Sequence, residues 1–538
     1  MTAAPRPVVV ARPVEQPFDL HAIDGAPQWR QGLVWPQAYP DAARLAEALH
    51  VATVAAIDRL PAGEVRDIGV LMGGYALASV LPLAEAACLV DAERQTGIRL
   101  QGQAPELAYL RGEAAEQPER RGGRSLKAHA LPRRLMLRRW ARSATWTGWL
   151  RLPLTMLLPQ AVAVSHNPLL CQVARRSGLR IGFAHGEALF QAARTTRPHP
   201  AVSDAGHGAV EAITRAILDT LALSPDVRDR LVGLVEDQCG WFAQEAARDL
   251  AVLRDAPLPE RLWAGTGGYW PIRAISVEVL RRGGEVTRFD HGGGAGLNRY
   301  RSNWALSDLS VSSRFYVATD ALASRVTASG ATELVAPTGG TAVSGGYGDP
   351  HIAAVPMRRA ARRAGSRRSV LYGPGPLLGF RQLVPALLPD PVALDWQLRL
   401  VAQLKTLPID LICRPHPEGL LRNRRHPVAA LIEPAKEAFE ALVARTDVFV
   451  FDYVQSTTFY LALCTNRPIV LIDMGAAPYA GDVANAIATR CRVVRADYGE
   501  DNLPRLDGAA LEAAVCEGPA VADASFFRSL ILGETGRA

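Results

Sequence analysis

Two stretches of this chain alternate short apolar runs with helical patterns, and this alternation constrains the fold more than any other feature. Each apolar run ends in glycine or in a small cluster of polar residues. The runs occupy residues 161–165, 180–183, 261–264, 285–289 and 315–318 in the first stretch, and 369–372, 410–413, 447–451 and 468–472 in the second. Strands that alternate with helices form parallel sheets with helices on both faces. The sequence therefore predicts an α/β protein with two Rossmann-like domains.

The length and the local composition predict where these two domains divide. A chain of 538 residues is too long for one compact core. Residues 337–350 are rich in glycine and proline, which indicates an interdomain linker. We therefore expect an N-terminal domain over 1–345 with helical insertions, and a C-terminal domain over 346–538 whose final helix packs back on the first.

Two further expectations concern the start of the chain. The apolar run at 67–72 is followed by two glycines and a helical pattern, which indicates the first strand of the first domain. Residues 1–40 are rich in proline and aromatic residues. We expect them to lie over the surface of that same domain.

The bulk composition excludes several classes of protein. Seven cysteines lack any CxxC spacing, so reduced thiols are expected rather than disulfides or a zinc knuckle. The N-terminus has no apolar export segment, and no run of 18 uncharged apolar residues occurs. A cytoplasmic location is expected. No cluster has metal-ligand spacing and no DxD pair is present, so the sequence predicts neither a metal nor another cofactor.

Two polar motifs carry the strongest chemical signal. Residues 414–417 read Arg-Pro-His-Pro and follow one predicted strand; residues 455–458 read Gln-Ser-Thr-Thr and follow the next. Both should emerge at the carboxyl edge of a parallel sheet, where such folds bind ligands. Hydroxyl groups at a helix start favour a phosphate, and Arg414 and His416 could face the same anion. Alternatively, the hydroxyl cluster is only a helix cap and His416 only a loop histidine.

These motifs resemble a known group of enzymes. RPHP at 414–417, followed by DVFVFDYVQSTTFYLALCTNRPIVLID at 447–473, is similar to the donor-binding half of GT-B glycosyltransferases that build bacterial surface polysaccharides. Within this group the chain is most similar to the CMP-Kdo-dependent retaining β-Kdo transferases of capsule and lipopolysaccharide assembly. Polysialyltransferases and CDP-glycerol glycerophosphotransferases are more distant. The resemblance covers about 369–475 and is fainter over 261–320.

The resemblance implies a fold, an activity and a nucleotide site. It implies two Rossmann-like domains whose parallel sheets face a central cleft, and transfer of Kdo or a related ulosonic acid from a CMP-activated donor to a glycan acceptor, including a lipid-linked one. No metal is expected. The nucleotide-binding residues carried over or expected beside the motif are Arg414, His416, Pro417, Gln455, Ser456, Thr457 and Thr458.

Two strand-end clusters in the first half are candidates for catalysis, His185-Gly186-Glu187 and Asp290-His291 with three glycines after it. Glycosyl transfer needs an acid/base group, and a retaining double displacement also needs a carboxylate nucleophile. Glu187 is the first acid/base candidate, followed by Asp290 and His291. The nucleophile remains open among Asp255, Glu260 and Asp290. As the alternative, the two histidines are only turn residues.

Several other functions fit the same architecture. They are transfer of a polyol phosphate from a CDP donor, a UDP-sugar transferase or epimerase, and a non-catalytic protein that only binds a glycan. The glycine turn at 265–268 lacks the dinucleotide fingerprint and a Walker lysine, so NAD and ATP are excluded.

Residues 120–151 contain ten Arg and Lys and no Asp or Glu, interleaved with leucines and tryptophans. The segment 131–149 can form a basic amphipathic helix. Such a helix could lie on an anionic membrane at its inner face, or it could be a solvated basic face of the domain. Nucleic acid is not expected, because a net charge of +7 is modest for this length and no recognised binding module is present.

Overall fold

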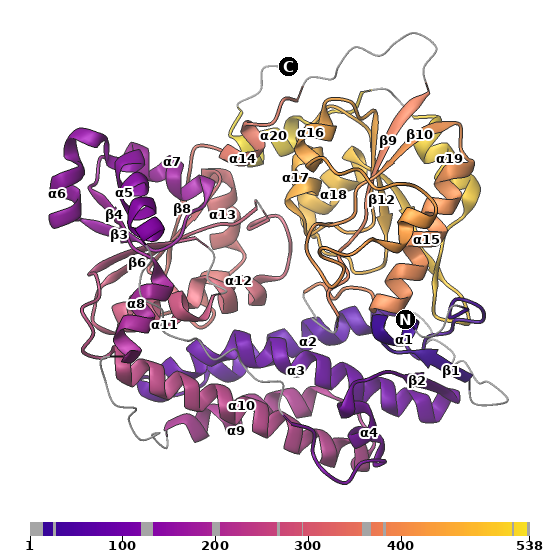
Figure 1. Ribbon diagram of the computed structural model, residues 1–538, viewed down its shortest axis with the longest axis horizontal. Coiled ribbons are helices and arrows are strands. Elements are labelled where there is room, and N and C mark those ends of the chain that lie inside the picture. The colour runs from indigo at the N-terminus through magenta and orange to yellow at the C-terminus, as the bar shows by residue number, and fades with distance from the viewer. Residues whose placement is uncertain are drawn as a thin grey trace.

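The computed structural model describes residues 14–24, 28–119, 133–195, 205–265, 269–292, 294–357, 367–379, 384–518 and 521–534. Within these ranges the chain forms two α/β lobes that stand on a shared layer of long helices (Figure 1).

The first lobe contains a six-stranded parallel sheet with the order β4-β3-β5-β6-β7-β8. Its strands are β3 (Ala161–Ala163), β4 (Ile181–Phe183), β5 (Arg261–Ala264), β6 (Glu285–Phe289), β7 (Arg314–Val317) and β8 (Ala342–Gly345). Its helices are α5 (Arg133–Thr147), α6 (Leu152–Leu157), α7 (Pro168–Ser177), α8 (Gly186–Thr195), α11 (Trp270–Arg281), α12 (Arg301–Ser307), α13 (Asp320–Ala328) and α14 (Pro350–Ala353).

Alternate residues of these strands enter different cores, as a pleated strand requires. Trp263 and Phe289 pack with α5 and α7 on one face, whereas Leu262 and Val286 pack with α8 and α11 on the other.

The second lobe contains a five-stranded parallel sheet with the order β10-β9-β11-β12-β13. Its strands are β9 (Arg368–Gly373), β10 (Ile409–Cys413), β11 (Val448–Phe451), β12 (Ile469–Asp473) and β13 (Arg492–Arg495). Its helices are α15 (Asp390–Thr406), α16 (Phe439–Val443), α17 (Thr457–Leu463), α18 (Gly481–Arg490) and α19 (Gly508–Cys516). The final helix, α20 (Ser525–Leu532), packs back against α13 and α14 of the first lobe. A short pair, β14 (Asp497–Tyr498) and β15 (Pro504–Arg505), is antiparallel. The molecule is thus mixed α/β with two large parallel sheets, which is compatible with two Rossmann-like domains.

The helical layer consists of α2 (Tyr39–Asp58), α3 (Glu64–Thr96), α9 (Ala205–Thr220) and α10 (Pro225–Leu253), with α4 (Pro105–Arg111) at its end. Two short parallel strands, β1 (Val14–Pro17) and β2 (Ile98–Gln101), lie beside this layer. Helix α1 (Leu20–Asp24) follows β1 in the chain. Among the described helices, α3 alone has the length and apolar composition of a membrane span. It packs between α2, α9 and α10 as a core helix does.

The predicted strand at 67–72 is wrong, because these residues lie inside α3. A short apolar run does not distinguish a buried strand from a buried helix. The following glycines permit close packing rather than a turn. A Cβ atom at Gly73 would clash with Cδ1 of Ile57 and would lie 3.3 Å from Cδ1 of Leu306.

Two expectations about chain segments also need correction. Residues 337–350 are not only a linker, because β8 within them pairs with β7 as the edge strand of the first sheet. The described part of the first 40 residues contacts both the helical layer of the N-terminal half and the second lobe, because β1 pairs with β2 and Phe18 packs in the core of the helical layer. Leu20 belongs to the core of that lobe, and Trp35 exchanges backbone and side-chain hydrogen bonds of 2.8–2.9 Å with Asp501 and Asn502.

The two lobes share an apolar core of their own. Leu297 and Phe315 of the first lobe pack in one cluster with Phe451 and Phe459 of the second. Polar contacts continue this interface, since the Tyr300 hydroxyl donates to the carbonyl oxygen of Ala476 at 3.0 Å. The strand-end loops of the two sheets are therefore held in a fixed relation.

Candidate active site

Asp290 directly follows β6 at the carboxyl edge of the first sheet. One carboxylate oxygen, Oδ1, accepts the backbone N–H of His291 at 2.8 Å. The other, Oδ2, is buried and forms no hydrogen bond of ordinary length and angle with the described residues, although the backbone N–H of Ala295 lies close to the carboxylate. His291 itself is exposed. The loop thus presents a half-satisfied acid beside an exposed imidazole.

Burial is the main reason that the pKa of Asp290 rises to about 7, and the nearby carboxylates of Asp308 and Asp349 add to it. Backbone N–H groups of His291 and Ala295 act in the opposite direction. A carboxyl group with this pKa is divided between its two protonation states near neutral pH. This is the condition under which an acid/base group works best.

The loop after β6 lies directly against the start of α17 in the other lobe. A Cβ atom at Gly292 would come 2.7 Å from Oγ1 of Thr457, and one at Gly294 would come 3.0 Å from the Tyr460 hydroxyl. Real Cβ atoms essentially never come as close as 2.7 Å, and 3.0 Å is tighter than most real contacts, so glycine allows the backbone of this loop to lie against these two side chains. The structure therefore brings together two predicted clusters, Asp290-His291 and Ser456-Thr458, from opposite halves of the chain.

The hydroxyl turn is organised by its own hydrogen bonds. Ser456 caps α17 by accepting the N–H of Phe459 at 3.2 Å, and its hydroxyl shares a 2.9 Å hydrogen bond with that of Thr458. Gln455 carries a buried Nε2 without a partner among the described residues. Because α17 has only seven residues, side-chain groups rather than a long helix would have to hold an anion here.

The Arg-Pro-His-Pro loop follows β10, on the other side of β9 from β11. Strand spacing places its start roughly 10 Å from the start of the hydroxyl turn. Arg414 is bound to its own lobe, because its Nε donates to the carbonyl oxygen of Glu437 at 2.7 Å and its Nη1 to that of Pro415 at 3.0 Å. Pro417 is exposed.

His416 is half-buried, and its tautomer follows from one contact. Its Nδ1 accepts the N–H of Glu418 at 3.2 Å, so this nitrogen is unprotonated and the hydrogen lies on Nε2. Burial lowers the pKa of His416, which also favours the neutral ring. The side chain is therefore prepared to donate one hydrogen bond from Nε2.

Glu187 is separated from Asp290. Glu187 lies in the first turn of α8, which follows β4. Three strand spacings, roughly 14 Å, separate the ends of β4 and β6. Its exposed carboxylate hydrogen-bonds the hydroxyl of Tyr269. Asp255 and Glu260 precede β5 and so lie at the amino edge of the sheet, opposite Asp290. Position therefore excludes both as partners of the β6 loop.

Two residues that sequence reasoning missed hold these loops in place. Asn167 caps α7, and its Nδ2 donates to the carbonyl oxygen of Asp290 at 3.1 Å. Asp452 directly follows β11 and accepts hydrogen bonds from the Tyr372 hydroxyl at 2.6 Å and from Trp396 Nε1 at 2.8 Å. Its place directly after four buried residues of β11 was the available signal.

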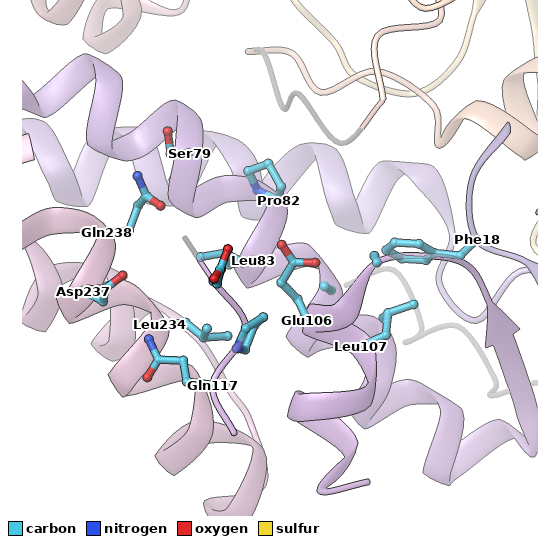
Figure 2. Close-up of a pocket in the computed structure, with 14 residues that line it drawn as sticks. Phe18, Ser79, Pro82, Leu83, Glu106, Leu107, Gln117, Leu234, Asp237 and Gln238 are labelled. Atoms are coloured by element: carbon cyan, nitrogen blue, oxygen red, sulfur yellow. The ribbon is translucent and has the colours of Figure 1, made fainter. Parts of the chain in front are cut away.

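Figure 2 shows a pocket of about 160 Å³ between α3, α4 and α10, which contains none of the predicted site residues. The charged residues that line it, Glu106, Glu119 and Asp237, are all acidic and would repel a phosphate. At the second sheet, a pocket of about 40 Å³ lies beside Asp452 and Tyr453, between the ends of β9 and β11. This is where the strand order reverses, the usual ligand position in such sheets.

In the part of the chain that the structure describes, no three His, Cys, Asp or Glu side chains gather in a way that could hold a metal ion. No protein-family model and no curated protein matches this sequence.

Proposed function

We propose that this protein is a GT-B glycosyltransferase that takes a sugar from a CMP-activated donor, with Kdo or a related ulosonic acid as the first candidate. The contact between Gly292 and Thr457 carries the proposal. It places a titratable carboxyl group of one parallel sheet beside the hydroxyl turn of another. Transfer from a nucleotide sugar needs both kinds of group at one point.

The donor would lie over the strand-end loops of the second lobe. A pocket of about 40 Å³ is far smaller than the roughly 300–1,000 Å³ of small-molecule sites. Only part of the nucleotide could therefore enter it. The hydroxyls of Ser456 and Thr457 and Nε2–H of His416 are neutral donors that suit a phosphate oxygen.

Asp290 would act on the acceptor. Its buried Oδ2 forms no hydrogen bond of ordinary length and angle with the described residues. Its pKa of about 7 lets it take a proton from a sugar hydroxyl as the oxygen of that hydroxyl forms the new bond to the donor sugar. The bond from the donor sugar to the phosphate breaks, and CMP leaves with the electron pair. A nucleophile for a retaining route must be ionised throughout, which suits Asp290 less well than the acid/base role.

Thermal-shift titration with CMP, CDP and UDP tests the choice of donor. The proposal predicts that CMP stabilises the protein most, by RT ln(1 + [L]/Kd). Preferential stabilisation by CDP would favour transfer of a polyol phosphate. Stabilisation by UDP alone would favour a UDP-sugar enzyme, and CMP binding with no transfer to any glycan acceptor would favour a non-catalytic protein.

A further inference from the structure

The outer end of the first lobe carries an unusual number of exposed apolar side chains. The end is formed by α5, α6 and the short 3-10 turn Trp149–Arg151 between them, and it points away from the second lobe (Figure 1). Leu150 is fully exposed, Leu157 is 78% exposed and Leu137 is 68% exposed. We call this set the outer apolar patch: Met136, Leu137, Trp140, Trp149, Leu150, Leu154, Leu157 and Leu158.

The spacing of these residues shows that they form continuous faces rather than scattered exceptions. Leu154, Leu157 and Leu158 stand three and four positions apart, so they share the outward face of α6. The buried residues of α6 are Leu152 and Thr155. A surface helix of a soluble protein normally packs its apolar face against the core. In α6 and at its C-cap, by contrast, three leucine side chains are exposed to solvent.

Basic residues flank this patch, and the part of the sequence that carries it contains no acidic residue. Residues 120–186 contain 13 Arg and Lys and no Asp or Glu. Arg134, Arg138 and Arg151 are exposed, and no carboxylate among the described residues pairs with them. Arg180 reaches the patch itself, because its Nε donates to the carbonyl oxygen of Leu158 at 3.1 Å.

The patch is held on a rigid base. The Ser143 hydroxyl oxygen of α5 accepts the backbone N–H of Phe183 in β4 at 2.9 Å. Trp146 is buried edge-on against the ring of Phe183, with 5.9 Å between the ring centres. The exposed side chains therefore project from elements anchored to the sheet.

We infer that this patch docks on an anionic phospholipid leaflet. Leucine and tryptophan side chains enter the interfacial region of a bilayer, and flanking arginines bind the acidic headgroups. Charge argues against a second copy of the chain, since a symmetric dimer through this face would bring two basic surfaces together. The inference does not depend on the identity of the sugar donor.

Flotation of the full chain with lipid vesicles tests the inference. The wild type should float with vesicles of phosphatidylcholine mixed with phosphatidylglycerol, but not with phosphatidylcholine alone. The triple variant Trp149→Ser/Leu150→Ser/Leu157→Ser and the variant Arg134→Ser/Arg138→Ser/Arg151→Ser should each lose binding. For the arginine variant we expect about a hundredfold weaker partitioning, since each arginine contributes about fivefold at an anionic surface.

The matched control is Val51→Ser/Val521→Ser, which removes exposed apolar side chains far from the patch and should leave flotation unchanged. Because all substituted residues are exposed, the melting temperatures should stay close to that of the wild type. Three results would overturn the inference: no flotation of the wild type on anionic vesicles, equal flotation of the variants, or a wild-type dimer in solution that the serine substitutions dissociate.

Discussion

Gly292 and Thr457 belong to opposite lobes, and a Cβ atom on Gly292 would lie 2.7 Å from the Thr457 hydroxyl oxygen. Gly292 also has a φ of +101°, a backbone conformation that residues with a side chain rarely adopt. The close approach sets Asp290, two residues earlier, beside the hydroxyl turn.

Gly292→Ala should lower turnover while nucleotide binding persists, because the added methyl group forces the β6 loop away from Thr457. Backbone strain alone should cost roughly 1–2 kcal/mol of stability. Gly63→Ala is the control, since Gly63 has a φ of +107° and open space around its Cβ position. Steady-state kinetics should separate the two variants. Equal turnover of both would show that the contact has no catalytic importance.

Asp290→Asn should change how stability depends on pH. An unfolded aspartate ionises near pH 4, whereas folded Asp290 has a pKa of about 7. Between these values the folded protein keeps a proton that the unfolded chain has lost, so the free energy of unfolding falls as pH rises. Asparagine does not titrate, so it removes this contribution. As pH rises across that window, the free energy of unfolding of the variant should increase relative to that of the wild type by at most about 1.4 kcal/mol per pH unit.

Denaturant titrations from pH 4 to 8 measure this difference. Asp390→Asn is the control, because burial also raises the pKa of Asp390 to about 7 and it lies at the start of α15, on another loop. It should show similar pH dependence but keep turnover, whereas Asp290→Asn should lose turnover. Parallel stability curves for wild type and Asp290→Asn would contradict the raised pKa.

His416→Ala should abolish stabilisation by CMP and abolish turnover, because it removes the Nε2–H donor at the nucleotide loop. His426→Ala is a matched control. The Nδ1 of His426 likewise accepts a backbone N–H, from Val428 at 3.3 Å, and burial lowers its pKa to about 4. Thermal shift with CMP should be lost only in the first variant. Loss in both would point to general damage of this lobe.

Glu187→Gln separates two assignments of the acid/base group. Strand spacing sets Glu187 roughly 14 Å from Asp290 along the sheet edge. If Asp290 is the acid/base group, Glu187→Gln should retain both the nucleotide shift and most turnover. If turnover falls by orders of magnitude in Glu187→Gln and survives in Asp290→Asn, then Glu187 rather than Asp290 is the acid/base group.

Much of the sheet architecture could be predicted from the sequence. Runs such as 447–451 and 468–472 are short, rich in β-branched or aromatic residues, and followed by polar residues. Their length, residue types and ends therefore all indicate buried strands. The run at 67–72 has the same apolar character, but it lies inside a 33-residue helix. Only its packing against Ile57 and Leu306 explains the two glycines after it, and those partners are distant in the sequence.

The parts of the candidate site could be predicted from local patterns, whereas their arrangement was implied only by the family resemblance. Strand ends placed Asp290 and Ser456 at sheet edges, because parallel strands end together. That the two edges meet through Gly292 depends on how the lobes pack, which no local pattern encodes. The roles of Asn167 and Asp452 are also tertiary, since each holds groups from other strands.

A crystal structure of the protein with CMP would show whether the loops after β10 and β11 hold the nucleotide. We expect the CMP phosphate within hydrogen-bond distance of the Ser456 or Thr457 hydroxyl and of His416 Nε2, with Asp290 facing it across the contact between the lobes. CMP bound elsewhere, for example in the acidic pocket between α3 and α10, with these side chains unoccupied, would contradict it.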